Sequence, residues 1–116
     1  MKQAVHFVVA WTVNEGKLAA FEEVAKAMSN GTRKEPGMLA YDWHSSADRK
    51  HWRLLETYAN PDAVVAHLKG PVVQQLVPKI MEVSKMDLLE IYGNPGPEAT
   101  AMLTAVGAVI FSDWTV

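Results

Sequence analysis

The spacing of apolar positions switches along the chain between a period of two and a period of three to four, which predicts alternating strands and helices. Residues 5–13 are apolar on both faces and rich in Val, Phe, Trp and Thr, as in a central strand. After an Asn-Glu-Gly turn, residues 17–31 carry apolar side chains three or four positions apart, which predicts an amphipathic helix. That helix must be over by Glu35, because Pro36 disfavours helical geometry in the residue before it.

Two extended segments follow, separated by a short polar turn, and we expect them to form a hairpin. The first covers residues 37–44, and its alternation predicts one face made of Leu39, Tyr41 and Trp43. The second covers residues 52–58, and its alternation predicts one face made of Trp52, Leu54, Glu56 and Tyr58. Trp11, on the first strand, could belong to either face of the sheet.

A second helical region begins at Asn60, which can cap a helix, and Pro61 suits its first position. We expect this helix to reach about Lys69, where a Gly-Pro pair breaks it. A further helical piece runs to about residue 83, and Pro78 inside it should kink or restart it.

Residues 86–92 predict a fourth strand, and the Asn-Pro-Gly-Pro run after it is a firm break. In the remaining tail, residues 99–106 are consistent with a short helix and residues 108–111 with a short strand. We therefore expect a core domain over residues 1–93 and a C-terminal tail over residues 94–116. The tail could pack on a partner subunit.

The predicted order, β-α-β-β-α-β, is typical of the ferredoxin-like α+β fold. It implies an antiparallel four-stranded sheet with helices on one face. The other face still carries apolar side chains, and a second copy of the chain could cover them. We therefore expect a homodimer packed sheet against sheet.

Composition narrows the function classes. The 116 residues suit one domain, and 11 basic against 13 acidic side chains give a net charge of −2, which does not indicate nucleic-acid binding. The chain has no cysteine, so disulfides and thiolate catalysis are excluded. The apolar runs are too short to span a bilayer, and we interpret residues 5–13 as a strand rather than a signal peptide. We expect a cytoplasmic protein without membrane contacts.

One stretch resembles a known family. Glu56 at a strand end is followed by an aromatic residue, a cap, an alanine-bearing helix and then His67, a spacing similar to that of the antibiotic biosynthesis monooxygenase family. The run Pro-Gly-Met-Leu-Ala-Tyr at 36–41 and the Gly-Lys pair at 16–17 also resemble that family. The resemblance covers roughly residues 5–93 and implies a dimeric α+β barrel.

The resemblance also implies chemistry, though less narrowly than fold. Some members of this family oxidise quinols or polycyclic aromatic phenols with O₂ and no metal or flavin, while related proteins degrade haem or isomerise small signalling molecules. Tyr58 stands where the family often has Trp. The first strand has no Asn before Asn14 in the turn, which disfavours haem degradation.

His67 and Glu56 are the candidate catalytic residues. An imidazole with a pKa near ~6.5 can accept or donate a proton at neutral pH. Glu56 could orient that imidazole or bind a substrate hydroxyl. The structural alternatives are a histidine that bonds a backbone carbonyl, and a glutamate that bonds a backbone amide or pairs with Arg33 or Arg53.

Four aromatic side chains from neighbouring strands could form a wall for a flat substrate, or could simply belong to the core: Tyr41, Trp43, Trp52 and Tyr58. His6, His44 and His51 lack the spacing of metal ligands, so no metal is expected, and no cofactor. The leading hypothesis is a cofactor-independent monooxygenase acting on a quinol or an aromatic phenol. The alternatives are a non-oxidative isomerase of a small metabolite and a non-catalytic ligand-binding dimer. An open cavity lined by His67 and Glu56 would favour catalysis, and a filled interior would favour the structural role.

Overall fold

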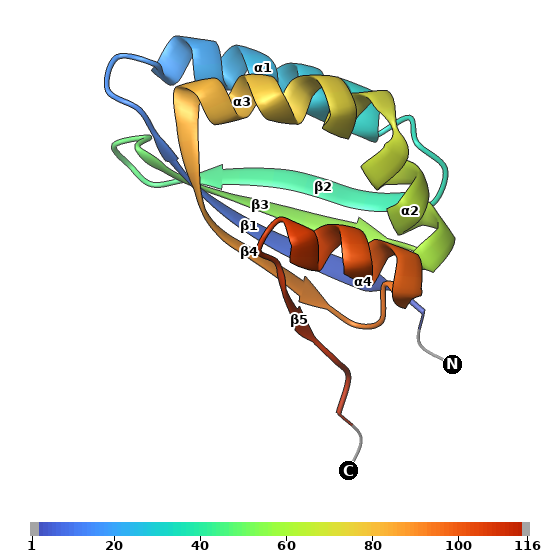
Figure 1. The fold of residues 1–116 in the computed structure, drawn as a ribbon. Coiled ribbons are helices and arrows are strands. Elements are labelled where there is room, and N and C mark those ends of the chain that lie inside the picture. Colours follow the sequence, from blue (N-terminus) through green and yellow to red (C-terminus); the bar gives the residue numbers. More distant parts are fainter. Residues whose placement is uncertain (1–2, 115–116) are drawn as a thin grey trace.

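A mixed five-stranded sheet is covered on one face by helices (Figure 1). The computed structural model describes residues 3–114. The strands lie in the order β2-β3-β1-β4-β5 and are β1 (Val5–Val13), β2 (Met38–Ser45), β3 (His51–Tyr58), β4 (Ser84–Tyr92) and β5 (Val109–Phe111). The helical elements are α1 (Leu18–Thr32), α2 (Pro61–Lys69), the π-helix η1 (Val72–Leu76), α3 (Val77–Val83) and α4 (Gly96–Ala105). The predicted α+β, ferredoxin-like core is confirmed.

Strand β1 is the third of the five strands in the sheet order and therefore lies at the centre of the sheet. It runs antiparallel to β3 on one side and to β4 on the other. Alternate residues from Val5 to Trp11 face the helices and are buried. Trp11, whose face the sequence left open, is among them and is 2% exposed.

The predicted helix boundaries follow the local chemistry. In α2, the Asn60 side chain accepts a hydrogen bond from the backbone N–H of Ala63 at 2.9 Å, and Pro61 occupies the first turn. Gly70 ends this helix, and the expected restart at Pro78 appears as the change from η1 to α3. Since a π-helix adds a residue to the turn, it also shifts which side chains of this segment point at the sheet.

The sheet differs from the prediction in one strand. The expected sheet was four-stranded and antiparallel, but β5 adds a fifth strand that runs parallel to β4. The chain leaves β4, crosses the helical face as α4 and returns in the same direction, as a strand-helix-strand crossover does. Helix α4 packs beside α2, where Lys69 forms an exposed ion pair with Glu98. Within this chain the tail therefore extends the sheet and the helical layer.

Strand β2 contains a bulge that overturns one predicted face. The pairing between β2 and β3 shifts between Met38 and Ala40. Met38 then packs against the core, while Leu39, which we predicted on the same face as Tyr41 and Trp43, is 63% exposed. A bulge adds one residue to a strand and so breaks the alternation from which that face was predicted.

The sheet face opposite the helices is open in this chain. Four large apolar residues on it are exposed: Leu55, Leu88, Val109 and Phe111. Among the described residues, no helix is long and apolar enough to cross a membrane.

Candidate functional site

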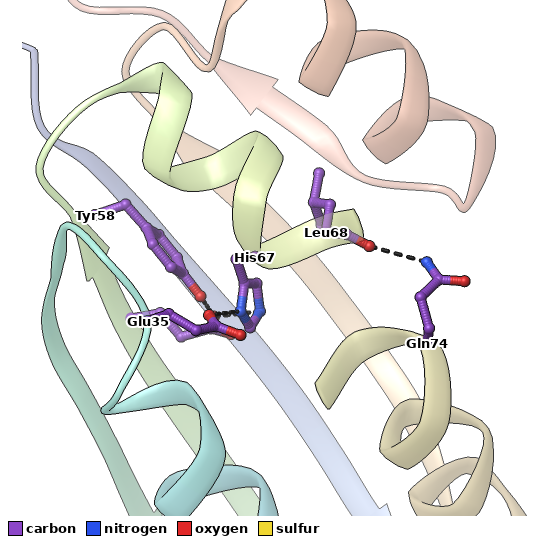
Figure 2. A network of polar contacts seen from close by, with 6 residues as sticks. Glu35, Tyr58, His67, Leu68 and Gln74 are labelled. Atoms are coloured by element: carbon purple, nitrogen blue, oxygen red, sulfur yellow. Dashed lines mark hydrogen bonds and ion pairs between the residues drawn. The ribbon is translucent and has the colours of Figure 1, made fainter. Parts of the chain in front are cut away.

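Two glutamates, a histidine and a tyrosine meet in the interior between the sheet and α2 (Figure 2). The His67 Nδ1 atom lies 2.6 Å from Glu35 Oε1, and its Nε2 atom lies 3.6 Å from Glu56 Oε1. The Tyr58 hydroxyl donates a short hydrogen bond to the same oxygen of Glu56. His67 and Glu56 are each 5% exposed, so the cluster is shielded from bulk water.

Each member of the cluster is placed by local structure. His67 lies on the buried face of α2, and Glu56 and Tyr58 lie on the helix-facing side of β3. Glu35 comes from the turn between α1 and β2. That turn approaches α2 closely at Gly37, where an added Cβ atom would lie 2.6 Å from the Cβ of Ala63. Gly37 also has a φ of 76°, which a side chain disfavours, so glycine at this position allows the turn to bring Glu35 within reach of the imidazole.

The contact with Glu35 determines which ring nitrogen of His67 carries the proton. A carboxylate accepts hydrogen bonds, so the short contact assigns the proton to Nδ1 of His67. In the neutral ring, Nε2 is then unprotonated and can act as a base. Of the two roles that we considered for Glu56, orienting the histidine at Nδ1 falls to Glu35, while Glu56 faces Nε2 at 3.6 Å, beyond a good hydrogen bond. The alternative, a histidine bonded to a backbone carbonyl, is not what the structure shows at Nδ1.

Glu56 is a carboxyl group in an environment that disfavours its charge. Burial raises its pKa, and neighbouring Glu35 raises it further, whereas His67 and the Tyr58 hydrogen bond lower it. The arginines that could have paired with it lie elsewhere: Arg33 donates to the Tyr41 carbonyl oxygen and Arg53 to the Trp52 carbonyl oxygen. Both contacts described for Glu56 use Oε1, so Oε2 is the oxygen left for a ligand.

A cavity of about 440 Å³ adjoins this cluster. Glu56, His67 and Tyr41 line it, together with apolar residues of β1, β4, η1, α3 and α4. This volume lies within the range of about 300–1,000 Å³ typical of small-molecule sites. The Tyr41 hydroxyl stays protonated, because burial and the nearby Glu56 raise its pKa well above its usual range.

The predicted aromatic wall is only partly present. Tyr41 lines the cavity, whereas Trp43, Trp52 and Tyr58 do not. Trp43 and Trp52 pack with Phe21 of α1, and their indole nitrogens donate to Ser29 and to the Arg49 carbonyl. The cavity instead extends towards β1 and β4, where Trp11 lines it. The Trp11 Nε1 atom is buried without a hydrogen-bond partner among the described residues.

The histidines outside the cluster do not form a metal site. His6, His44 and His51 are exposed on their strands. Among residues 3–114, no three His, Cys, Asp or Glu side chains are grouped so that they could hold a metal ion. In the buried cluster, the two carboxylates lie at opposite ring nitrogens of His67 and thus do not converge on one point.

We next compared the chain with known protein families. The sequence profile of the antibiotic biosynthesis monooxygenase family matches residues 4–79, which is more than half of the chain. The chain belongs to this family. Among curated proteins, none matches the chain. The family match includes β1 to α2 and hence every member of the buried cluster.

Solved structures show the same fold. A conserved protein of unknown function from Bacteroides thetaiotaomicron is 30% identical, covers 78% of this chain and 97% of its own, and has a TM-score of 0.71. MupZ from Pseudomonas fluorescens is 18% identical, with 98% and 93% coverage and a TM-score of 0.81. SnoaB, a cofactor-independent oxygenase from Streptomyces nogalater, is 19% identical, with 82% and 96% coverage and a TM-score of 0.71. The latter two likenesses support the fold alone.

Glu35 is the member of the cluster that sequence reasoning missed. It lies 32 positions before His67, far beyond the spacing of neighbouring elements. Its place before a proline indicates where α1 must end, which concerns its backbone rather than its side chain. An acidic residue in a Pro-Gly turn next to the candidate histidine's helix was the available sequence indication.

Proposed function

We propose that this member of the antibiotic biosynthesis monooxygenase family is a cofactor-independent monooxygenase acting on a quinol or an aromatic phenol. The proposal depends on one observation: a histidine held by a buried carboxylate, with a second carboxyl group beside it, lies in the wall of an apolar cavity of about 440 Å³. This arrangement supports general-base catalysis on a phenol ring that is shielded from water.

The first step is proton transfer. The substrate hydroxyl donates its proton to His67 Nε2, and the Glu35 carboxylate stabilises the imidazolium through Nδ1. Glu56 accepts or donates a hydrogen bond at the substrate's hydroxyl oxygen through its Oε2 atom. The hydrogen bond from the Tyr58 hydroxyl to Oε1 keeps Glu56 in place. The product of this step is a phenolate, which is a much better electron donor than the phenol.

The second step uses O₂. The phenolate passes one electron to O₂, and the resulting aryloxyl radical and superoxide combine into a carbon–oxygen bond at a ring carbon. His67 first returns its proton to the distal oxygen, which gives a hydroperoxide. His67 Nε2, unprotonated again, then removes the proton from that ring carbon as the O–O bond breaks, which leaves a new ring carbonyl and releases hydroxide. The hydroxide takes up this proton and leaves as water. In sum, a phenol with a free ring position and O₂ give a quinone and water, and the substrate supplies all four electrons.

The two alternatives make different demands on the same groups. A non-oxidative isomerase of a small metabolite would need His67 and Glu56 but no oxygen. A non-catalytic ligand-binding dimer would need the cavity but would tolerate loss of the histidine. A cavity lined by both residues supports catalysis over a purely structural role, and its largely apolar lining supports an aromatic substrate over a small polar metabolite.

The test is a screen of the purified protein against quinols and phenols with oxygen consumption as the readout. We expect turnover of at least one compound, its loss under anaerobic conditions, and at least a tenfold lower rate in His67→Ala. His44→Ala, which removes an exposed histidine, is the matched control and should keep the rate. An unchanged rate in His67→Ala would remove this residue from the mechanism, and turnover without oxygen would favour the isomerase.

We also propose a homodimer packed sheet against sheet, which the apolar residues on the open sheet face support. Leu55 and Leu88 lie near the middle of that face and are 41% and 37% exposed. A second copy would bury them without touching the cavity, which lies on the other side of the sheet.

A further inference from the structure

The cavity is chemically different on its two sides. Its polar lining residues, Tyr41, Glu56 and His67, come from β2, β3 and α2. The residues that η1, α3 and the region of α4 contribute are all apolar and not aromatic: Val73, Val77, Pro78, Met81, Leu103 and Val106. A ligand part that lies against this second group meets no hydrogen-bonding side chain there.

The apolar side is also where the cavity meets solvent. Met81 on α3 is 43% exposed, and Val106, directly after α4, is 65% exposed. The polar residues at the other side are 2–5% exposed. A ligand that fills the cavity from His67 to this side would therefore reach an apolar mouth between α3 and the end of α4.

The shape of the lining favours a flexible chain over a second flat ring at this mouth. Aromatic lining residues belong to the sheet, whereas methionine and branched aliphatic residues line the helical side. Methionine in particular adapts to ligands of varied conformation. We propose that the substrate is amphipathic, with an oxygen-bearing ring at His67 and Glu56 and an aliphatic chain that leaves between Met81 and Val106. The part of this proposal that concerns the ring rests on the proposed function, and the part that concerns the aliphatic chain does not.

The segment that forms one wall of the mouth lies outside the matched core of the family. Leu103 and Val106 follow residue 79, where the family profile ends. The MupZ structure matches 98% of this chain, so it has counterparts of α4 and β5. The Bacteroides relative aligns over 97% of its own length to only 78% of this chain, which leaves it little room for such an addition. The added segment would thus adapt a shared reaction site to a longer substrate.

Chain length is the variable that tests this inference. Burying one methylene group contributes about 0.8 kcal/mol, which is about a fourfold gain in affinity. Straight-chain 4-alkylphenols of increasing length, titrated calorimetrically under anaerobic conditions, should bind about fourfold more tightly for each added carbon. The gain should then stop once the chain emerges at the mouth.

Two variants and a control locate the chain. Leu103→Trp should fill the channel, so that the gain stops at a shorter chain while the shortest phenols bind as before. Val106→Asp alters an exposed residue and should weaken only the longest chains by about tenfold or more, whether or not the Leu103 variant folds. Ala101→Asp, at an exposed residue of α4 that does not line the cavity, should leave the whole series unchanged.

The inference would be overturned by an affinity that does not change with chain length, by equal gains in all three variants, or by no binding of any phenol. The first two outcomes are separable from the proposed function, and the third refutes both. Chain-dependent binding without turnover would keep this inference and refute the monooxygenase. Turnover of short phenols with chain-independent binding would do the reverse.

Discussion

Replacing Glu56 by Gln tests whether the fold holds a carboxyl group in surroundings that oppose its charge. The substitution keeps the size of the side chain and an oxygen that can accept the Tyr58 hydrogen bond. It removes the charge from a residue that is 5% exposed and whose Oε1 atom lies 3.6 Å from Nε2 of His67. The experiment therefore separates the cost of the buried charge from the packing around it.

The sign of the effect follows from the pKa. Burial raises the pKa of Glu56 in the folded protein above its ordinary value of 4.5. Between these two values the folded protein holds a proton that the unfolded chain has lost, so the free energy of unfolding falls as pH rises through this window. Each pH unit that the window spans is worth about 1.4 kcal/mol. Above the window the full cost of the buried carboxylate is present, and the neutral Gln does not have it.

We expect Glu56→Gln to gain stability relative to the wild type as pH rises from 4 to 8, by about 1 kcal/mol or more. Guanidinium unfolding across that pH range, followed by circular dichroism, measures the difference. Glu22→Gln is the control, because Glu22 forms an exposed ion pair with Arg49 and should show no such trend. A stability difference for Glu56→Gln that is flat with pH, or that moves against the variant, would refute this account of the site.

Three further predictions concern the residues around the site and the open sheet face. Glu35→Gln removes a charged hydrogen bond to His67 that is worth about 1.5–3 kcal/mol, so it should lower turnover by about 10- to 150-fold. In ¹⁵N NMR the His67 proton should no longer be fixed at Nδ1, and an unchanged spectrum would contradict this role of Glu35. Gly37→Ala should destabilise the fold by about 2–3 kcal/mol in thermal unfolding, against about 1 kcal/mol for Gly107→Ala, because both glycines have positive φ but only Gly37 is crowded. Equal losses of stability would refute the close approach of the Gly37 turn to α2. Leu55→Asp should convert a dimer into a monomer in light scattering, and a wild type that is already monomeric would disprove the sheet-to-sheet dimer.

The sequence was sufficient for the elements whose signals are local. The Asn60-Pro61 start of α2 and the restart of the helix at Pro78 depend on backbone chemistry within a few residues, and both appear as predicted. The bulge that turns Leu39 outwards and the parallel pairing of β5 depend on contacts between segments far apart in the chain. Such contacts do not change the spacing of apolar residues within a single strand, so this spacing could not predict them.

The candidate site divides in the same way. Its histidine and the β3 carboxylate could be found because they belong to adjoining elements whose spacing resembles that of a known family. Its third member, Glu35, meets His67 only because a crowded turn packs on α2, and the cavity includes Leu103 and Val106 only because α4 folds back over the sheet. Aromatic residues drew attention to β2 and β3, while the cavity extends under β1 and β4.

The same local motif occurs twice in this chain, and the two copies show what position in the sheet adds to sequence. Glu56 and Tyr58 on β3, and Glu90 and Tyr92 on β4, have identical spacing, and in both pairs the tyrosine hydroxyl donates to the glutamate. Glu56 pairs with Phe7 on the helix-facing side of β1, whereas Glu90 pairs with Val8 on the open side. Only the first pair is therefore enclosed beside a histidine and a cavity. A one-residue shift of register would exchange their surroundings, so the reactive character of Glu56 comes from strand pairing rather than from its motif.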